Sequence, residues 1–203
     1  MVNKILLLDY GGVLGYDHLI KQEELLANKV GLTIDELNIR LSEKSVAGRN
    51  FRENKISEVE FWRIVSQSSI MNEHSAHTLT SLWMDTYSLN NSMMAYLQQL
   101  RQKIKIGVLT NIDIGRSRLL ERILDINNNL DYYFPSYIFG FSKDTTQLWD
   151  LINKELLKDS GFVDVIYVDD REEHVISAER IGWKGIRYYN FEQFKKQFEL
   201  LSE

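Results

Sequence analysis

Short apolar runs recur along the chain, and segments of helical period lie between them. Nearly continuous apolar runs are typical of strands buried on both faces of a parallel sheet. Gly185–Tyr189 is a fifth candidate after four clearer runs: Lys4–Leu8, Lys105–Leu109, Tyr137–Phe139 and Val165–Val168. Between runs, residues such as Leu148, Ile152 and Leu156 share one helix face. The pattern predicts an α/β fold, with a parallel Rossmann-like sheet and helices on both faces.

The stretch from residue 15 to 90 breaks this rhythm, because it contains several amphipathic segments and no convincing strand. Two pairs within it have the capping-box spacing that marks helix starts: Thr33 with Glu36, and Ser57 with Glu60. We therefore expect residues 1–14 and 91–203 to form the α/β core. Residues 15–90 are expected to form an inserted α-helical cap.

Composition narrows the range of functions. The 203 residues, 44% of them hydrophobic, suffice for one domain with a sizeable insertion. The absence of cysteine excludes disulfides, thiol nucleophiles and cysteine-based zinc sites. A net charge of −5 without a basic stripe argues against a nucleic-acid partner. Because no apolar stretch approaches about 18 residues, we expect no membrane partner and a soluble, cytoplasmic protein.

Polar residues follow each apolar run, at the edge where doubly wound sheets bind ligands. In chain order these residues are Asp9-Tyr10-Gly11-Gly12, Thr110-Asn111, Ser142-Lys143 and Asp169-Asp170. Three carboxylates gathered in one place repel one another unless a cation joins them, and a set of hard oxygen ligands favours Mg²⁺. A desolvated Asp can act as nucleophile, while hydroxyl, amide and Lys groups hold phosphoryl oxygens. The combination indicates phosphoryl transfer.

These four segments resemble, in order and spacing, the four motifs of the haloacid dehalogenase-like (HAD) hydrolases. The matching strings are Leu8-Asp9-Tyr10-Gly11-Gly12-Val13-Leu14, Val108-Leu109-Thr110-Asn111, Ser142-Lys143 and Tyr167-Val168-Asp169-Asp170. The insertion after the first motif resembles the helical cap of the superfamily's sugar-phosphate-type phosphatases. Gly182-Trp183-Lys184-Gly185-Ile186 is similar to the strand approach after their fourth motif.

The resemblance implies a nucleophile and a metal site. Asp9 would form an aspartyl-phosphate, and Mg²⁺ would be bound by Asp9, the Gly11 carbonyl and Asp169. Asp170 would provide a second metal contact, with a water between the carboxylate and the ion as one alternative.

The resemblance also assigns the phosphate ligands. Thr110 and the Asn111 amide would bind the phosphoryl group, and Lys143 would neutralise both Asp9 and the transferred phosphate. The cap would close over the site and select the substrate. The implied partner is a small phosphorylated metabolite.

One departure from the family's pattern bears on rate. Most family phosphatases have a second Asp two positions after the nucleophile, and this chain has Gly11 there. Loss of a general acid or base typically costs about 10²–10⁴ in rate, so we expect slow hydrolysis of an ester with a good leaving group, a sugar 1-phosphate being one candidate. Asp17 and Asp113 are alternative acids, although loop and capping roles are more typical of such residues.

Two other functions stay open. A non-catalytic HAD-like binding or regulatory protein would also explain Gly11 and the Asp144-Thr145-Thr146 segment, where the family often has Pro-Asp-Pro. A 2-haloacid dehalogenase would need an arginine from the cap, which Arg49 or Arg52 could supply. Trp83 and Met84 are expected to pack within the cap. The four histidines show no metal-ligand spacing and are expected on the surface or in the cap: His18, His74, His77 and His174.

Overall fold

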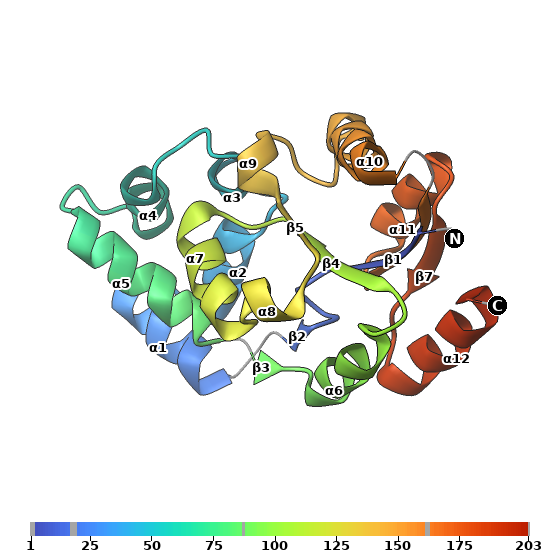
Figure 1. Ribbon diagram of the computed structural model, residues 1–203. Helices are drawn as coiled ribbons and strands as arrows, with labels where there is room; N and C mark the ends of the chain where they lie inside the picture. The colour runs from blue at the N-terminus through green and yellow to red at the C-terminus, as the bar shows by residue number, and fades with distance from the viewer. Residues whose placement is uncertain (1–2, 17–19, 87, 161–162, 203) are drawn as a thin grey trace.

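A computed structural model describes residues 3–16, 20–86, 88–160 and 163–202. Within these residues, five parallel strands form one sheet in the order β5-β4-β1-β6-β7 (Figure 1). The strands are β1 (Asn3–Leu8), β4 (Lys105–Thr110), β5 (Tyr132–Pro135), β6 (Val163–Asp169) and β7 (Lys184–Arg187). The predicted parallel α/β fold is confirmed.

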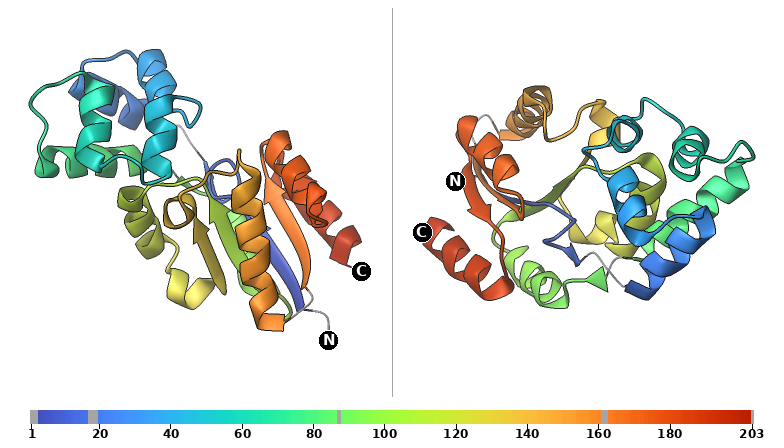
Figure 2. Two further views of the ribbon diagram at one scale, coloured as in Figure 1. Left: turned by 90° about the horizontal axis from the view of Figure 1, so that it is seen from above. Right: turned by 180° about the vertical axis from the view of Figure 1, so that it is seen from behind.

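Alternate side chains of the strands enter two hydrophobic cores, one on each face of the sheet. On β1, Leu6 and Leu8 pack on the face covered by α6, α7 and α12, whereas Ile5 and Leu7 pack on the face covered by α10 and α11 (Figure 2). These helices are α6 (Asn91–Leu100), α7 (Ile114–Ile123), α10 (Thr146–Ser160), α11 (Glu172–Arg180) and α12 (Phe191–Ser202). Burial on both faces explains why the strands read as continuous apolar runs.

One predicted strand is wrong. Tyr137–Phe139 lies in the short helix α9 (Ser136–Phe139), which ends where Gly140 takes a φ of 72°. The strand at this edge is β5, just before it, and the short helix α8 (Ile126–Asn129) precedes β5. Proline cannot donate to a sheet ladder, so Pro135 suits the end of an edge strand and divides the two apolar runs. The fifth candidate strand is correct in place, but it ends at Arg187.

Five helices between β1 and α6 form a separate helical lobe, defined as α1 to α5. Their bounds are α1 (Ile20–Val30), α2 (Ile34–Leu41), α3 (Val46–Arg52), α4 (Glu58–Ser66) and α5 (Glu73–Met84). The lobe has its own core, in which Phe51, Phe61, Trp62 and Trp83 are buried against one another. Figures 1 and 2 show the lobe beyond one end of the sheet.

Local signals set the boundaries of the lobe. Thr33 forms the complete capping box with Glu36, and Ser57 caps α4 by accepting from the Glu60 amide. Where the chain enters and leaves the lobe, β2 (Gly15–Tyr16) pairs antiparallel with β3 (Ser88–Leu89), although no strand was predicted there. This two-stranded pairing joins the lobe to the core through two adjacent chain crossings.

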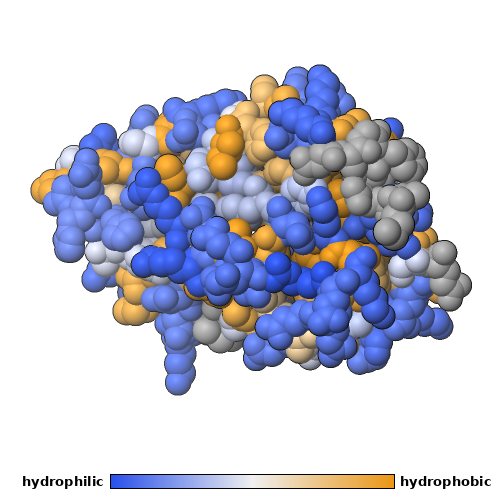
Figure 3. Space-filling view, viewed as in Figure 1, coloured by the Kyte–Doolittle hydropathy of each residue, from blue (hydrophilic) through white to orange (hydrophobic). Residues whose placement is uncertain are grey.

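The surface is mainly polar. On the face in Figure 3, hydrophilic residues surround small hydrophobic patches. Among the described residues, no helix combines the length and apolar character needed to cross a membrane.

Candidate active site

Three carboxylates meet at one edge of the sheet because their strands are neighbours. Leu8 on β1 is paired with Val168 on β6, and the Asp9 amide donates to the Val168 carbonyl at 2.8 Å. Asp9 and Asp169 therefore leave adjacent strand ends together, with Asp170 next in the chain. One oxygen from each of the three carboxylates lies within 4.8 Å of the others.

A buried lysine lies between two of these carboxylates. Lys143 Nζ is 2.9 Å from Asp9 Oδ1 and 2.7 Å from Asp169 Oδ2. Burial acts to lower the pKa of Lys143, but the charges of Asp169 and Asp9 outweigh it and raise that pKa. The Trp149 indole donates to the Lys143 carbonyl at 2.8 Å, which fixes this part of the loop. Lys143 is therefore a permanent cation in the site.

Asp169 is held by several donors. Its Oδ2 accepts from Lys143 and from the Tyr167 hydroxyl at 2.5 Å, and lies 3.1 Å from His174 Nδ1. Its Oδ1 accepts from the Arg171 amide at 2.9 Å. Burial disfavours the charged form, but Lys143 and His174 prevail and hold the pKa of Asp169 well below its usual range. This carboxylate is ionised and fixed in orientation.

Asp9 and Asp170 behave in the opposite way. Burial raises the pKa of Asp9 to about 6, and Asp169 adds to the effect although Lys143 opposes it. Desolvation and the charge of Asp169 raise the pKa of Asp170 to about 6 as well. Two carboxylates that resist ionisation together are stabilised when a cation joins them.

A tight turn places Asp170 beside the end of β1. The Tyr10 amide donates to Asp9 Oδ1 at 2.7 Å, and the Gly15 amide closes the turn by donating to the Tyr10 carbonyl. Gly12 has a φ of 72°, and a Cβ there would lie 2.7 Å from the Asp170 carboxyl carbon. Conformation and space both require glycine at this position.

A cavity of about 180 Å³ opens in front of Asp9. The core lines it with Thr110 and Asn111, which follow β4, and the lobe lines it with Glu43. Asn111 links these parts, because its Oδ1 accepts from the Lys143 amide at 2.9 Å and its Nδ2 donates to Glu43 Oε2 at 2.7 Å. The full lining is Asp9, Tyr10, Gly11, Glu43, Arg52, Met84, Thr110, Asn111, Ile112, Arg116, Lys143, Asp170, Arg171 and His174.

Known structures share this fold. The chain is similar to the HAD family enzyme BT-2542 from Bacteroides thetaiotaomicron, solved with magnesium and inorganic phosphate, with a TM-score of 0.74 and 18% identity over 97% of this chain and 99% of that one. The chain is also similar to a predicted HAD-like family hydrolase from Porphyromonas gingivalis, with a TM-score of 0.75 and 19% identity over 100% of this chain and 99% of that one. The chain has the HAD-like fold.

A more distant match is the 2-haloacid dehalogenase from Pseudomonas syringae pv. Tomato DC3000. It gives a TM-score of 0.62 and 16% identity over 93% of this chain and 86% of that one. No protein-family model and no curated protein matches the sequence. The fold predicted from the four motifs is thus confirmed by structure rather than by overall sequence similarity.

Within this HAD-like fold, one histidine differs from expectation. His174 was expected on the surface or in the cap, yet it lies on α11 of the core with only 1% of it exposed, and its Nε2 lies 3.4 Å from Asp144 while Nδ1 faces Asp169. Burial and Lys143 oppose protonation, but the hydrogen bonds to Asp144 and Asp169 raise the pKa of His174. His74 and His77 are exposed on α5, as expected, and His18 lies outside the described residues.

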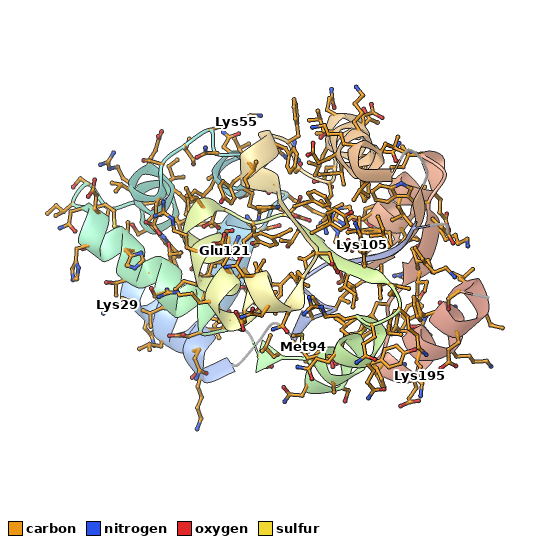
Figure 4. The ribbon with its side chains drawn as sticks, in the orientation of Figure 1. Lys29, Lys55, Met94, Lys105, Glu121 and Lys195 are labelled. Carbon is orange, nitrogen blue, oxygen red and sulfur yellow. The ribbon has the colours of Figure 1, made fainter. Side chains whose placement is uncertain are left out.

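Two further groups were missed because they act across the boundary between lobe and core. Arg171, which directly follows the fourth motif, forms an ion pair with Glu43 of the lobe. The Ser142 amide, next to Lys143, donates to Glu53 Oε1 at 3.1 Å. Glu53 also pairs with Lys55 at 2.6 Å, and Figure 4 labels Lys55 at the outer edge of the lobe. Only the fold brings these residues together.

Asp113 and Asp17 were the two alternatives for the missing acid. Asp113 is fully buried and caps α7, accepting from the Arg116 amide at 2.9 Å. Its structural role matches the capping interpretation. Asp17 lies outside the described residues.

Proposed function

We propose that this protein is a Mg²⁺-dependent phosphohydrolase that uses Asp9 as nucleophile on a small phosphate ester. The observation that carries the proposal is the pairing of Asp9 and Asp170, two close carboxylates with pKa values raised to about 6, beside the buried cation Lys143. Hydrolysis of phosphate esters uses these parts, an anionic nucleophile and cations around the phosphoryl oxygens.

The carboxylates fit a hard divalent cation. Asp9, Asp170 and the Gly11 carbonyl would hold Mg²⁺, since all offer oxygen ligands and Asp9, Asp170 and Gly11 line the same cavity. Asp169 was expected as a direct ligand, but its four hydrogen-bond donors favour a supporting role in which it orients Lys143. Bound Mg²⁺ would neutralise the carboxylates and polarise the phosphoryl group.

Each residue of the site has a role in one of two reaction steps. An Asp9 carboxylate oxygen attacks phosphorus, the ester P–O bond breaks, and the leaving alkoxide takes a proton from water. Water next attacks the phosphorus of the aspartyl-phosphate, which releases inorganic phosphate and restores Asp9. Thr110 and the Asn111 backbone amide bind phosphoryl oxygens, and Lys143 offsets the negative charge that accumulates in the transition state.

Gly11 supplies no proton, so we propose that turnover is slow. His174 does not replace the missing acid, because its two ring nitrogens face Asp169 and Asp144. Residues 15–90, including the helical lobe, act as the cap that covers the cavity. The hydrogen bonds of Glu43 and Glu53 to core loops support this role.

The test is release of phosphate from an aryl phosphate with and without Mg²⁺. We expect Mg²⁺-dependent turnover, and a loss of about 10³-fold or more in Asp9→Asn, as removal of a nucleophile usually causes. Asp150→Asn, on the exposed side of α10, is the matched control and should retain activity. Turnover without metal, or turnover that survives Asp9→Asn, would contradict the proposal.

The rival functions give different results in the same assay series. A 2-haloacid dehalogenase is favoured by one observation, that Arg52 lines the cavity, and it would release halide from 2-chloropropionate without metal. A non-catalytic binding protein would show no turnover of any ester while its melting temperature rises with Mg²⁺ and phosphate.

A further inference from the structure

Two arginines from different parts of the fold meet at the wall of the catalytic cavity. Arg52 ends α3 of the lobe, Arg116 lies in the first turn of α7 of the core, and both line the cavity that contains Asp9. Their exposed fractions are only 7% and 3%. Both guanidinium groups lie over the ring of Trp83, at 5.3 Å for Arg52 and 3.4 Å for Arg116.

Each guanidinium is held in place. Arg116 Nε donates to Asp113 Oδ2 at 2.6 Å, and its guanidinium carbon lies close over the ring of Trp83, which itself stacks on Phe61. Arg52 Nη1 donates to the Gly48 carbonyl at 2.9 Å. Contacts with an aromatic ring and with fixed acceptors orient a guanidinium before any ligand arrives. The pair is therefore prearranged rather than mobile.

Two other basic residues of the cavity, Lys143 and Arg171, lie at the reaction centre and at its rim. Lys143 contacts Asp9, and Arg171 pairs with Glu43. Arg52 and Arg116 lie instead where the lobe meets the core, beside Trp83. Each guanidinium carries five N–H donors in a planar fork, which matches the two oxygens of a carboxylate.

We propose that the substrate carries a carboxylate as well as its phosphate, and that Arg52 and Arg116 recognise this carboxylate. The inference rests on the proposed phosphohydrolase function and specifies its substrate class as short phosphorylated carboxylic acids. The cavity of about 180 Å³ has room for a short chain that ends in a carboxylate. Because Arg52 belongs to the lobe and Arg116 to the core, the recognition site is formed only where these two parts of the chain meet.

The test compares two esters that differ in one group, 3-phosphoglycerate and glycerol 1-phosphate, in the Mg²⁺-loaded full-length protein. We expect kcat/KM to favour the carboxylate ester by about 10- to 100-fold, the effect of a charged hydrogen-bonded pair. Arg52→Gln should reduce this ratio at least about tenfold. Arg116→Lys should also reduce it, and keeps a positive charge opposite Asp113 so that the protein still folds.

The controls are Arg63→Gln on α4 and Arg118→Gln on α7, both exposed, and neither should change the ratio. Equal rates for the two esters, or a preference that survives both Arg52→Gln and Arg116→Lys, overturns the inference while phosphate release still supports the proposed function. If 1,3-propanediol bisphosphate is preferred over both esters, the assignment of a carboxylate is overturned. If no ester is hydrolysed, the proposed function fails and the inference fails with it.

Discussion

Lys143 lies between two carboxylates, Asp169 and Asp9, whose pKa values are shifted in opposite directions. On one side Asp169 lies 2.7 Å from Nζ, and its neighbours Tyr167, His174 and the Arg171 amide add further donors. On the other side Asp9 lies 2.9 Å from the same Nζ, yet burial raises its pKa to about 6. Two carboxylates at similar distances from one lysine thus have pKa values shifted in opposite directions, because their other surroundings differ.

The difference teaches which carboxylate belongs to the framework. Asp169 is stabilised as an anion by the protein itself, so its role is to hold Lys143. Asp9 and Asp170 lie close together, each with a raised pKa, and a divalent cation would stabilise both. On the inner side of the site, defined as Asp169 with its donors Lys143, Tyr167, His174 and the Arg171 amide, the protein itself stabilises the charge. The outer side, defined as Asp9 and Asp170, would be stabilised by a bound cation.

Lys143→Met should have the largest effect, because it removes the cation shared by both sides. Two buried carboxylates would lose their partner, and breaking a buried pair typically costs about 3–5 kcal/mol of unfolding free energy. Turnover of an aryl phosphate should fall by about 10²–10³-fold, because transition-state charge is no longer offset. Urea unfolding and phosphate release measure the two effects. Lys154→Met, exposed on α10, is the control, and equal behaviour of the two variants would refute the assignment.

Asp9→Asn and Asp169→Asn should shift the stability of the metal-free protein in opposite directions. The pKa of Asp9 is higher in the folded state than its ordinary 3.8, so its contribution to stability is present below about pH 4 and lost as pH rises through about 6. Asp9→Asn cannot ionise and should be more stable than the parent at pH 8, by about 3 kcal/mol. At pH 4 the difference should vanish.

Asp169→Asn should be less stable than the parent at neutral pH, because the folded-state pKa of Asp169 is lowered. Stability from a lowered pKa is present above the unfolded value of 3.8 and is lost only as pH falls below it towards the folded value, so this deficit should persist from pH 8 down to pH 4. Thermal unfolding in chelator from pH 4 to 8 measures both variants. Shifts of the same sign would show that the two sides of Lys143 do not differ as described.

The sequence predicted which residues meet at the edge of the sheet, but not the different roles of the carboxylates on the two sides of Lys143. Buried apolar strands end where polar residues begin, and parallel strands end at one edge, so Asp9, Thr110 and Asp169 could be placed together from the pattern alone. The roles of Asp169 and Asp170 could not be separated, because they depend on His174, which reaches the site only through the packing of α11.

Short apolar runs limited the prediction of the fold. Tyr132–Pro135 and Tyr137–Phe139 are similar in composition and length, yet one forms edge strand β5 and the other helix α9. Local pattern does not separate them, since pairing with β4 decides the strand. The contact of Arg116 with Trp83 was likewise out of reach, because it joins the core to a helix of the inserted lobe.

Gly12→Ala tests whether the position of Asp170 on the outer side of the site determines Mg²⁺ affinity. The new Cβ would lie 2.7 Å from the Asp170 carboxyl carbon and displace that carboxylate. We expect Mg²⁺ affinity to fall about 10- to 100-fold, as for loss of a group that orients a metal ligand. Gly31→Ala is a matched control, because Gly31 has a φ of 71° with no atom within 4 Å of a Cβ. Titration calorimetry with Mg²⁺ should show weaker binding in the first variant only, and equal binding would exclude the clash.

Tyr167→Phe should have the smallest effect and separates framework from chemistry on the inner side. It removes the hydroxyl that donates to Asp169 Oδ2 at 2.5 Å, and a hydrogen bond to a charged group is worth about 1.5–3 kcal/mol. Tyr133→Phe removes a partly buried hydroxyl paired with the neutral Ser117 at 2.8 Å, so its cost should be about 1 kcal/mol. Because Lys143 still holds Asp169, Tyr167→Phe should lower the melting temperature more than it lowers kcat. A large loss of kcat without loss of stability would instead place Tyr167, and with it the inner side, within the reaction itself.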